Sequence, residues 1–372
     1  MGVLASRVVS QMGKIKVALA GVGNCASALI QGIHYYRENP PVEDGLTTGL
    51  MHPSFGPYKV EDITFVAAFE VNRKKIGADL SKAIFTEPNV APKISDVPDM
   101  DVTVKPGPVL DGVAPHMKEA FHVYSKSKTK PVDVAAELKD SGAEILVNYL
   151  PVGSEKGARF YAQAAVDAGC GFVNCIPEFI ASTDSWAKKF EEHKLPIAGD
   201  DVKSQVGATI VHRSLVDLCL KRGVRVDESY QLNLGGDTDF LNMTVEERLH
   251  SKRISKTTAV ASLIPYSVPT RIGPSDYVPH LKNKKICYIY LKGRGWGNIP
   301  LQIDLKLAVE DSPNSGGVVA DVIRAVKIGL DRGIGGPLTS ISSYSFKYPP
   351  VKIPDGQASQ WVEEYIQGKR ER

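Results

Sequence analysis

Several features are missing from this 372-residue sequence, and each absence argues against a class of protein. No apolar run approaches the roughly 20 residues that a membrane-spanning helix needs, so we expect no membrane partner. The charges nearly balance, with 45 Lys and Arg against 42 Asp and Glu, so no global field attracts nucleic acid. The eight histidines show no metal-ligand spacing, although carboxylates could hold a divalent cation.

Cysteine is also scarce. The five cysteines are scattered along the chain, and none stands in the Cys-x-x-Cys spacing that is typical of zinc and redox sites. We therefore expect buried, reduced thiols and a cytoplasmic protein. The five are Cys25, Cys170, Cys175, Cys219 and Cys287.

What the sequence does contain is a glycine motif. A short apolar run over residues 14–20 leads into Gly21-x-Gly23-x-x-Ala26, and a helical pattern follows over residues 26–36. The order of strand, tight turn and helix suits a dinucleotide, whose pyrophosphate lies on the N–H groups at the helix N-terminus. Gly21 would allow the turn, Gly23 would let the backbone approach the phosphates, and Ala26 would keep helix and strand close. Alone the motif is weak, because short glycine spacings recur by chance.

The next expected strand, residues 64–71, carries Glu70 near its end. In dinucleotide-binding folds an acidic residue at this place binds the adenosine ribose, and its charge favours NAD over NADP. Glu70 stands 47 residues beyond Gly23 instead of the usual ~20, and an ordered loop over residues 40–58 explains the excess. A plain exposed acid at a strand end is the alternative interpretation.

Strand and helix patterns alternate through the middle of the chain, which predicts a parallel sheet with helices on both faces. Ligands gather at the carboxyl ends of such strands, and polar residues stand there at 148–149, 174 and 200–201. The expected strands are 144–150, 171–176 and 195–199, and the expected helices are 155–168 and 182–193.

From about residue 224 the pattern changes to longer alternating runs. These runs predict a second sheet with few crossover helices, ending near residues 311–314, before a helix over 318–330. They cover residues 229–234, 286–291 and 301–309.

Charged clusters offer candidate chemistry. Asp200 and Asp201 stand at a strand end near Lys203; either they lie in a crevice, where repulsion raises one pKa, or they cap a following helix. Residues 235–242 form a glycine turn with acids and an amide, which an ordinary turn also explains.

A positive stripe is a third candidate. Arg248, Lys252 and Lys256 are spaced four apart and would share one side of a helix. The stripe either binds a phosphate monoester or is a solvated surface balanced by Glu246 and Glu247.

Together these motifs resemble those of the myo-inositol-1-phosphate synthases in their shorter prokaryotic form. The resemblance implies an α/β fold: an NAD(P)-binding Rossmann domain with a doubly wound parallel sheet, formed by residues 1–200 and 311–372. An inserted α+β domain, residues 201–310, would serve catalysis and assembly into a homotetramer. The matching segments are 21–27, 49–52, 55–58, 149–154, 199–205, 240–242, 251–256 and 311–315.

The resemblance also implies a hidden redox cycle on glucose 6-phosphate. NAD takes hydride from carbon 5, a base removes a proton at carbon 6, and the enolate attacks the aldehyde at carbon 1. NADH then returns the hydride, which gives 1D-myo-inositol 3-phosphate, the first intermediate of inositol biosynthesis.

The same resemblance assigns roles to residues. Lys252 would serve hydride and proton transfer at carbon 5, and Lys256 the phosphate or the enolate. Lys285 and Lys347 would stabilise the developing oxyanions. Pocket-shaping positions fall on Asp201, Lys203 and Asp311. The NAD positions are Gly21, Gly23, Asn24, Cys25, Ala26, Glu70, Asp79, Ser141, Tyr161, Ser204, Asp239 and Lys252.

Two other functions remain to be distinguished. An ordinary NAD-dependent dehydrogenase would accumulate NADH as it consumed substrate. A catalytically inactive NAD-sensing regulator would have lost the family's lysines, whereas all four are present in this chain.

Overall fold

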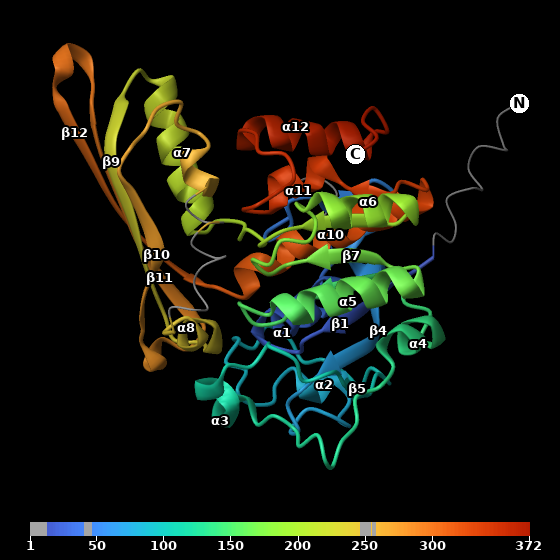
Figure 1. Cartoon of the computed structure of the whole chain (residues 1–372). Coiled ribbons are helices and arrows are strands. Elements are labelled where there is room, and N and C mark those ends of the chain that lie inside the picture. Colours follow the sequence, from blue (N-terminus) through green and yellow to red (C-terminus); the bar gives the residue numbers. More distant parts are fainter. Residues whose placement is uncertain (1–12, 41–46, 246–253, 255–257) are drawn as a thin grey trace, which may run out of the picture.

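The computed structural model describes residues 13–40, 47–245, 254 and 258–372 (Figure 1). Its larger sheet has seven strands in the order β13-β8-β7-β6-β1-β4-β5, and every pair of neighbours is parallel. Read from β5, the first six strands follow the 3-2-1-4-5-6 order of a Rossmann fold, which confirms the expected fold class. The strands are β1 (Ile15–Ala20), β4 (Ile63–Glu70), β5 (Val104–Pro106), β6 (Ile145–Asn148), β7 (Gly171–Asn174), β8 (Pro196–Gly199) and β13 (Gly336–Pro337).

Helices cover both faces of this sheet (Figure 1). On one face lie α1 (Asn24–Glu38), α10 (Pro313–Asp331) and α11 (Thr339–Ser345), with α12 (Asp355–Ile366) packed against α11. On the other face lie α4 (Val134–Asp140), α5 (Glu155–Ala168) and α6 (Asp184–Glu192).

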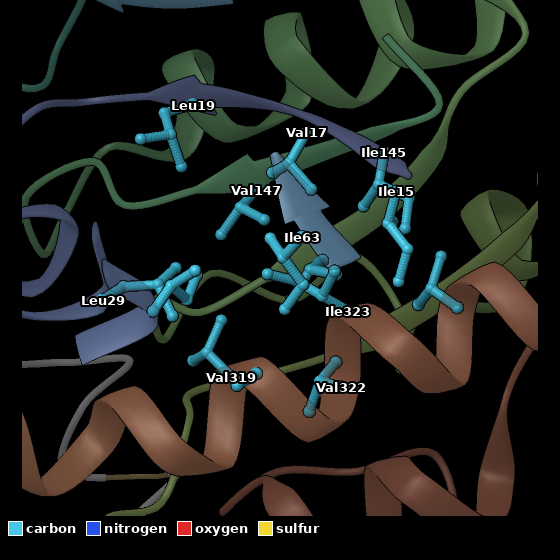
Figure 2. Close-up of a cluster of buried hydrophobic side chains, with 14 of the residues drawn as sticks. Ile15, Val17, Leu19, Leu29, Ile63, Ile145, Val147, Val319, Val322 and Ile323 are labelled. Carbon is cyan, nitrogen blue, oxygen red and sulfur yellow. The ribbon is translucent and has the colours of Figure 1, made fainter. Parts of the chain in front are cut away.

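The apolar composition of β1 explains its central place. Ile15, Val17 and Leu19 belong to the core that α1 and α10 cover, as Figure 2 shows. Ala18 and Ala20 belong to the core on the opposite face, under α5. Since successive side chains of a strand point to opposite faces, a strand buried on both faces is a nearly continuous apolar run.

The smaller sheet has four strands in the order β10-β9-β11-β12. β11 is antiparallel to both of its neighbours, and β10 runs parallel to β9. Helix α7 packs on the face turned toward the rest of the molecule, whereas the described chain places no helix on the outer face (Figure 1). The second sheet was expected, and so was a helix after residues 199–205, which is observed as α7, whereas β10 was not expected. These elements are α7 (Ala208–Lys221), β9 (Arg225–Gly235), β10 (Thr270–Tyr277), β11 (Lys284–Arg294) and β12 (Pro300–Glu310).

The segments after residue 311 return to the larger sheet, where β13 pairs with β8 and α10 packs against β7 and β8. The exact division at 200 and 310 stays a prediction. Within the described ranges, no helix combines the length and apolarity that crossing a membrane requires. The shorter elements are β2 (Ser54–Phe55), β3 (Tyr58–Lys59), η1 (Val60–Asp62), α2 (Leu80–Ala83), η2 (Pro115–Met117), α3 (Lys118–Phe121), α8 (Thr238–Asn242), η4 (Pro279–Leu281) and η5 (Trp296–Asn298).

Candidate active site

A cavity opens at the carboxyl ends of β1, β4, β6, β7 and β8. It spans the point between β1 and β6 where the strand order reverses, which is where open α/β sheets bind ligands. Its lining runs from the glycine loop at 21–25 to Lys285, Asp311 and Lys347. The cavity therefore joins the predicted NAD site to two of the predicted lysines.

The glycine loop has the geometry that a dinucleotide needs. Gly21 has φ +94°, and a Cβ there would lie 2.8 Å from the Tyr149 carbonyl oxygen, so only glycine fits. A Cβ on Gly23 would meet nothing within 4 Å, which leaves room for a ligand to approach the backbone. Gly23 is also the N-cap of α1, and no side chain caps it, so N–H groups of the first turn remain available to a pyrophosphate.

Glu70 lies in the cavity and also holds the glycine loop. Its Oε2 accepts a hydrogen bond from Val22 N at 3.0 Å, and its Oε1 accepts from Val71 N at 2.7 Å. Lys75 adds a contact that the sequence did not indicate: its buried Nζ donates to the Val22 carbonyl at 2.8 Å and to Asn89 Oδ1 at 2.8 Å. Burial lowers the pKa of Lys75.

Two other predicted loop residues make structural contacts. Asn24 lines the cavity, and its Oδ1 accepts from the backbone N–H groups of Val90 and Ala91 at 2.7 and 3.1 Å. Cys25 also lines the cavity, where burial, reinforced by the charges of Asp311 and Asp237, raises the pKa of its thiol to about 12. A thiol of that pKa is a poor nucleophile.

A buried row of polar side chains crosses the carboxyl ends of three strands. Asn148 Nδ2 donates to Asn174 Oδ1 at 2.9 Å, and Asn174 Nδ2 donates to Asp200 Oδ1 at 2.7 Å. Asp200 also accepts backbone N–H groups from residues 180–182. Burial raises the pKa of Asp200 to about 6. The interpretation of Asp200 as a cap of the next helix is wrong, because α7 starts at Ala208 with Gly207 as its N-cap.

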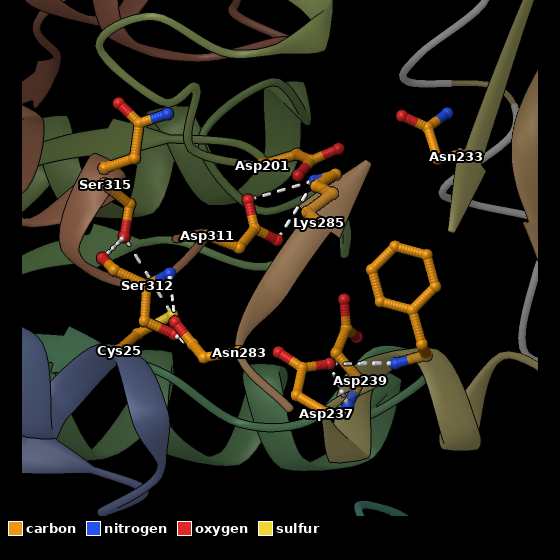
Figure 3. Close-up of polar contacts among 12 residues, drawn as sticks. Cys25, Asp201, Asn233, Asp237, Asp239, Asn283, Lys285, Asp311, Ser312 and Ser315 are labelled. Atoms are coloured by element: carbon orange, nitrogen blue, oxygen red, sulfur yellow. Dashed lines mark hydrogen bonds and ion pairs between the residues drawn. The ribbon is translucent and has the colours of Figure 1, made fainter. Parts of the chain in front are cut away.

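Two lysine–aspartate pairs face the cavity. Lys285 Nζ lies 3.1 and 3.0 Å from the two carboxylate oxygens of Asp311 (Figure 3). Lys347 Nζ lies 2.8 Å from Asp201 Oδ1. Asn283 fixes the turn that carries Asp311, because its carbonyl accepts a hydrogen bond from Asp311 N at 3.0 Å. No pattern in the sequence indicated this residue.

Other acidic residues line the same region. Asp237 caps α8 by accepting from the backbone N–H groups of Asp239 and Phe240 at 3.0 and 3.2 Å. Asp237 and Asp239 both line the cavity, and Figure 3 draws them below the Lys285–Asp311 pair. Within the described part of the chain, no group of three His, Cys, Asp or Glu side chains is arranged to hold a metal, so a cation stays a prediction.

The remaining predicted residues fall in different places. Tyr161 and Ser204 line the cavity, whereas Ala26, Asp79, Ser141 and Lys203 do not. Asp79 Oδ1 accepts from Ser81 N at 2.8 Å at the start of α2, and Ser141 Oγ donates to the Leu138 carbonyl at 3.2 Å at the end of α4. Lys252 and Lys256 lie outside the described residues, as does Arg248 of the stripe.

Comparison with known proteins places this site in a family. A family model described as myo-inositol-1-phosphate synthase matches residues 207–312. Inositol-3-phosphate synthase of Mycolicibacterium smegmatis is 51% identical over 363 residues, covering 96% of this chain and 99% of the relative. The chain belongs to the inositol-3-phosphate synthase family.

Further comparisons agree with membership of this family. The inositol-3-phosphate synthase of Corynebacterium glutamicum is 51% identical over 360 residues, covering 95% of this chain and 98% of the relative. A myo-inositol-1-phosphate synthase-related protein from Thermotoga maritima matches with a TM-score of 0.77 over 95% of this chain and 98% of its own. At 23% identity that structure supports the fold alone. The isomerase family expected from the sequence is confirmed.

Proposed function

We propose that this chain converts glucose 6-phosphate to myo-inositol 3-phosphate in the described cavity, with NAD held at the glycine loop. The observation that carries the proposal is the meeting of two lysine–aspartate pairs with that loop in one cavity. The comparisons support the reaction because relatives at 51% identity over nearly the whole chain carry this synthase name.

The cavity fits NAD at the end formed by β1 and β4. The open space at Gly23 and the uncapped N-terminus of α1 suit a pyrophosphate, and Glu70 suits the adenosine ribose. Tyr161, Ser204 and Asp239 would complete the site along the cavity wall. When bound, NAD supplies hydride acceptance from carbon 5 and its later return.

The lysines supply charge where oxygens become negative. A ketone oxygen at carbon 5 gains negative charge when carbon 6 loses a proton, and the aldehyde oxygen gains it as the ring closes. We assign Lys285 and Lys347 to these oxygens because each ammonium lies in the cavity beside a carboxylate that holds it in place. Lys252 and Lys256 keep their proposed roles in proton transfer and phosphate binding.

The test is to incubate the protein with glucose 6-phosphate and a trace of NAD, and to follow products by phosphorus NMR. We expect inositol phosphate in large excess over the NAD added, with no build-up of NADH absorbance. NADH rising in step with substrate consumption would identify a dehydrogenase instead. Cofactor binding without any turnover would identify a regulator.

We further propose a homotetramer in a reducing, cytoplasmic compartment. No disulfide links the five cysteines, all of which lie in the described residues, and this supports the compartment. The outer face of the smaller sheet supports assembly, because it exposes Tyr230, Leu232 and Tyr288, and Tyr230 stacks on Tyr290 of the neighbouring strand. Light scattering should give a tetramer for the wild type and a smaller species for Tyr288→Lys. A monomeric wild type would contradict the assembly.

A further inference from the structure

Beside the cavity, but not lining it, lies a cluster of three charged residues that we call the buried triad: Lys203, Arg213 and Asp355. Lys203 Nζ lies 2.9 Å from Asp355 Oδ1, and Arg213 Nε lies 2.5 Å from Asp355 Oδ2. The side chains of Lys203 and Arg213 are 3% and 5% exposed. The three residues come from the loop after β8, from α7 and from the first turn of α12, so the triad ties three distant segments together.

Lys203 fixes the end of helix α11. Its Nζ donates to the carbonyls of Ser343 and Tyr344 at 3.1 and 3.0 Å, and its backbone N–H donates to the Ser345 carbonyl at 2.8 Å. A helix leaves its last carbonyls without intrahelical partners, and a cation there is favoured by the helix dipole. Lys203 therefore determines where the chain leaves α11, two residues before Lys347.

Backbone pairing carries this constraint to the cavity. Residues 200–203 lie antiparallel to residues 345–348, with Val202 bridged to Phe346. Lys347 N donates to the Asp201 carbonyl at 2.8 Å, and the Lys347 ammonium contacts the carboxylate of the same Asp201. The positions of Lys347 and Asp201 thus both depend on a short antiparallel ladder of backbone hydrogen bonds that ends at Lys203.

Arg213 connects the triad to two further segments of the backbone. Its Nη2 donates to the Ile353 carbonyl at 3.1 Å, and its Nη1 donates to the Ala259 carbonyl. Ala259 stands three residues after Lys256 in the sequence. Arg213 therefore holds the approach to α12, and with it Asp355, against a segment that follows the predicted lysine stripe.

Holding a fold together with three buried charges carries a large desolvation free energy. Burial lowers the pKa of Lys203 to about 8, with the charges of Arg213 and Lys347 acting in the same direction and Asp355 opposing them. A well-packed apolar set is often as stabilising as a buried ion cluster, whereas removing one member leaves uncompensated charge. The contacts of this cluster lead to a cavity lysine, which gives its placement a functional reason.

We propose that Asp355, Lys203 and Arg213 are positioning residues that set the Lys347 ammonium opposite Asp201 in the cavity. The catalytic part of this inference rests on the proposed function. The geometric part does not, because the position of Lys347 can be measured without turnover.

The test compares Asp355→Asn with a matched control, Glu144→Gln. Glu144 belongs to another charged cluster, with Lys327 at 2.8 Å and Asp331 beyond it, at the amino ends of the strands. Glu144 and Asp355 are similarly exposed, at 31% and 28%. Four quantities are measured for each variant: the rate at which acetic anhydride labels Lys347, kcat, the Kd for NAD, and the melting temperature.

For Asp355→Asn we expect faster Lys347 labelling and a kcat about 10–100-fold lower, because small misplacements of reacting groups cost that much. The Kd for NAD should stay at the wild-type value, and Asp355→Glu should recover part of kcat. Glu144→Gln should lower the melting temperature without changing labelling or kcat. If Asp355→Asn does not fold, Arg213→Lys takes its place. That variant keeps the positive charge but loses the guanidinium contacts with the backbone carbonyls of Ala259 and Ile353.

Unchanged Lys347 labelling in Asp355→Asn or Arg213→Lys would overturn the proposal. So would an equal loss of kcat in Glu144→Gln, since the effect would then be general destabilisation. A wild type that makes no inositol phosphate would refute the proposed function, while the labelling rates would still decide the positioning of Lys347.

Discussion

The two ends of the cavity are constructed in different ways. The cofactor end, around Gly21, Gly23 and Glu70, is shaped by the backbone at the ends of two adjacent strands. The lysine end, around Lys285 and Lys347, is shaped by side-chain ion pairs between residues up to 146 positions apart. Backbone shape should tolerate most side-chain changes, except where only glycine fits. An ion pair, by contrast, should be lost when either of its two side chains is replaced. Under the proposed roles, this difference separates NAD binding from the chemical steps, and substitutions can test that separation.

The largest expected effect is at the lysine end. Lys285→Met should lower product formation about 10²–10³-fold, because a charged donor beside a developing oxyanion contributes that much. NAD affinity, measured by titration calorimetry, should not change. The control is Lys188→Met on α6, where Lys188 forms an exposed pair with Glu192 at 3.8 Å, away from the cavity and from the smaller sheet. A comparable loss in the control, or weakened NAD binding in Lys285→Met, would erase the distinction between the two ends.

The two loop glycines should respond differently to alanine. Gly21→Ala places a Cβ at a positive φ and against Tyr149, which should cost about 1–3 kcal/mol of the free energy of unfolding. Gly23→Ala meets no protein atom, so it should fold normally yet bind NAD more weakly, because its methyl group occupies ligand space. Urea unfolding and NAD titration separate the two. Equal stability losses would show that Gly23 serves the fold as well.

Glu70→Ala should weaken NAD binding by about tenfold, the equivalent of one charge-assisted hydrogen bond. With saturating NAD, kcat should equal that of the wild type, because the proposed contact of Glu70 is with the ribose and not with the reacting carbons. Glu87→Ala, which removes an exposed acid paired with Lys74, is the control. A fall in saturated kcat would instead link the cofactor end to the chemistry.

An effect of similar size to that of Glu70→Ala concerns pH and the buried triad beside the lysine end. Lys203 has a pKa of about 8 in the folded protein, so between that value and 10.5 the unfolded chain binds more protons. Stability therefore rises with pH through this window. Relative to Lys203→Met, the wild type should gain about 1–2 kcal/mol of unfolding free energy between about pH 7.5 and 9.5. A pH-independent difference would show that Asp355 offsets the burial and leaves Lys203 with its ordinary pKa.

Periodicity predicted much of the fold from local residues. The helix expected over 155–168 is observed as Glu155–Ala168, and the strands at 171–176 and 195–199 differ from β7 and β8 only at their ends. A helix was expected after residues 199–205, but the bounds of α7 were not predicted, because its buried side mixes Thr209, His212 and Arg213 with apolar residues. Strand β10 contains Gly273 and Pro274, which indicate a turn, yet an edge strand tolerates proline.

The site was predictable only where its signal was local. Gly21 and Gly23 have a recognisable spacing, and the lysines were assigned by resemblance. The contacts of Lys75, Asn283 and Asp355 depend on how distant segments pack, so no local pattern indicates them. Asp355, for example, meets Lys203 from 152 residues away.

The central claim is that the cofactor end and the lysine end act on one substrate within a single turnover. The most direct measurement uses glucose 6-phosphate deuterated at carbon 5, with a trace of unlabelled NAD and mass spectrometry of the product. Since the hydride removed from carbon 5 is returned to it before product leaves, we expect the inositol phosphate to retain the deuterium. Product that has lost the deuterium, or deuterated NADH accumulating in solution, would contradict the account.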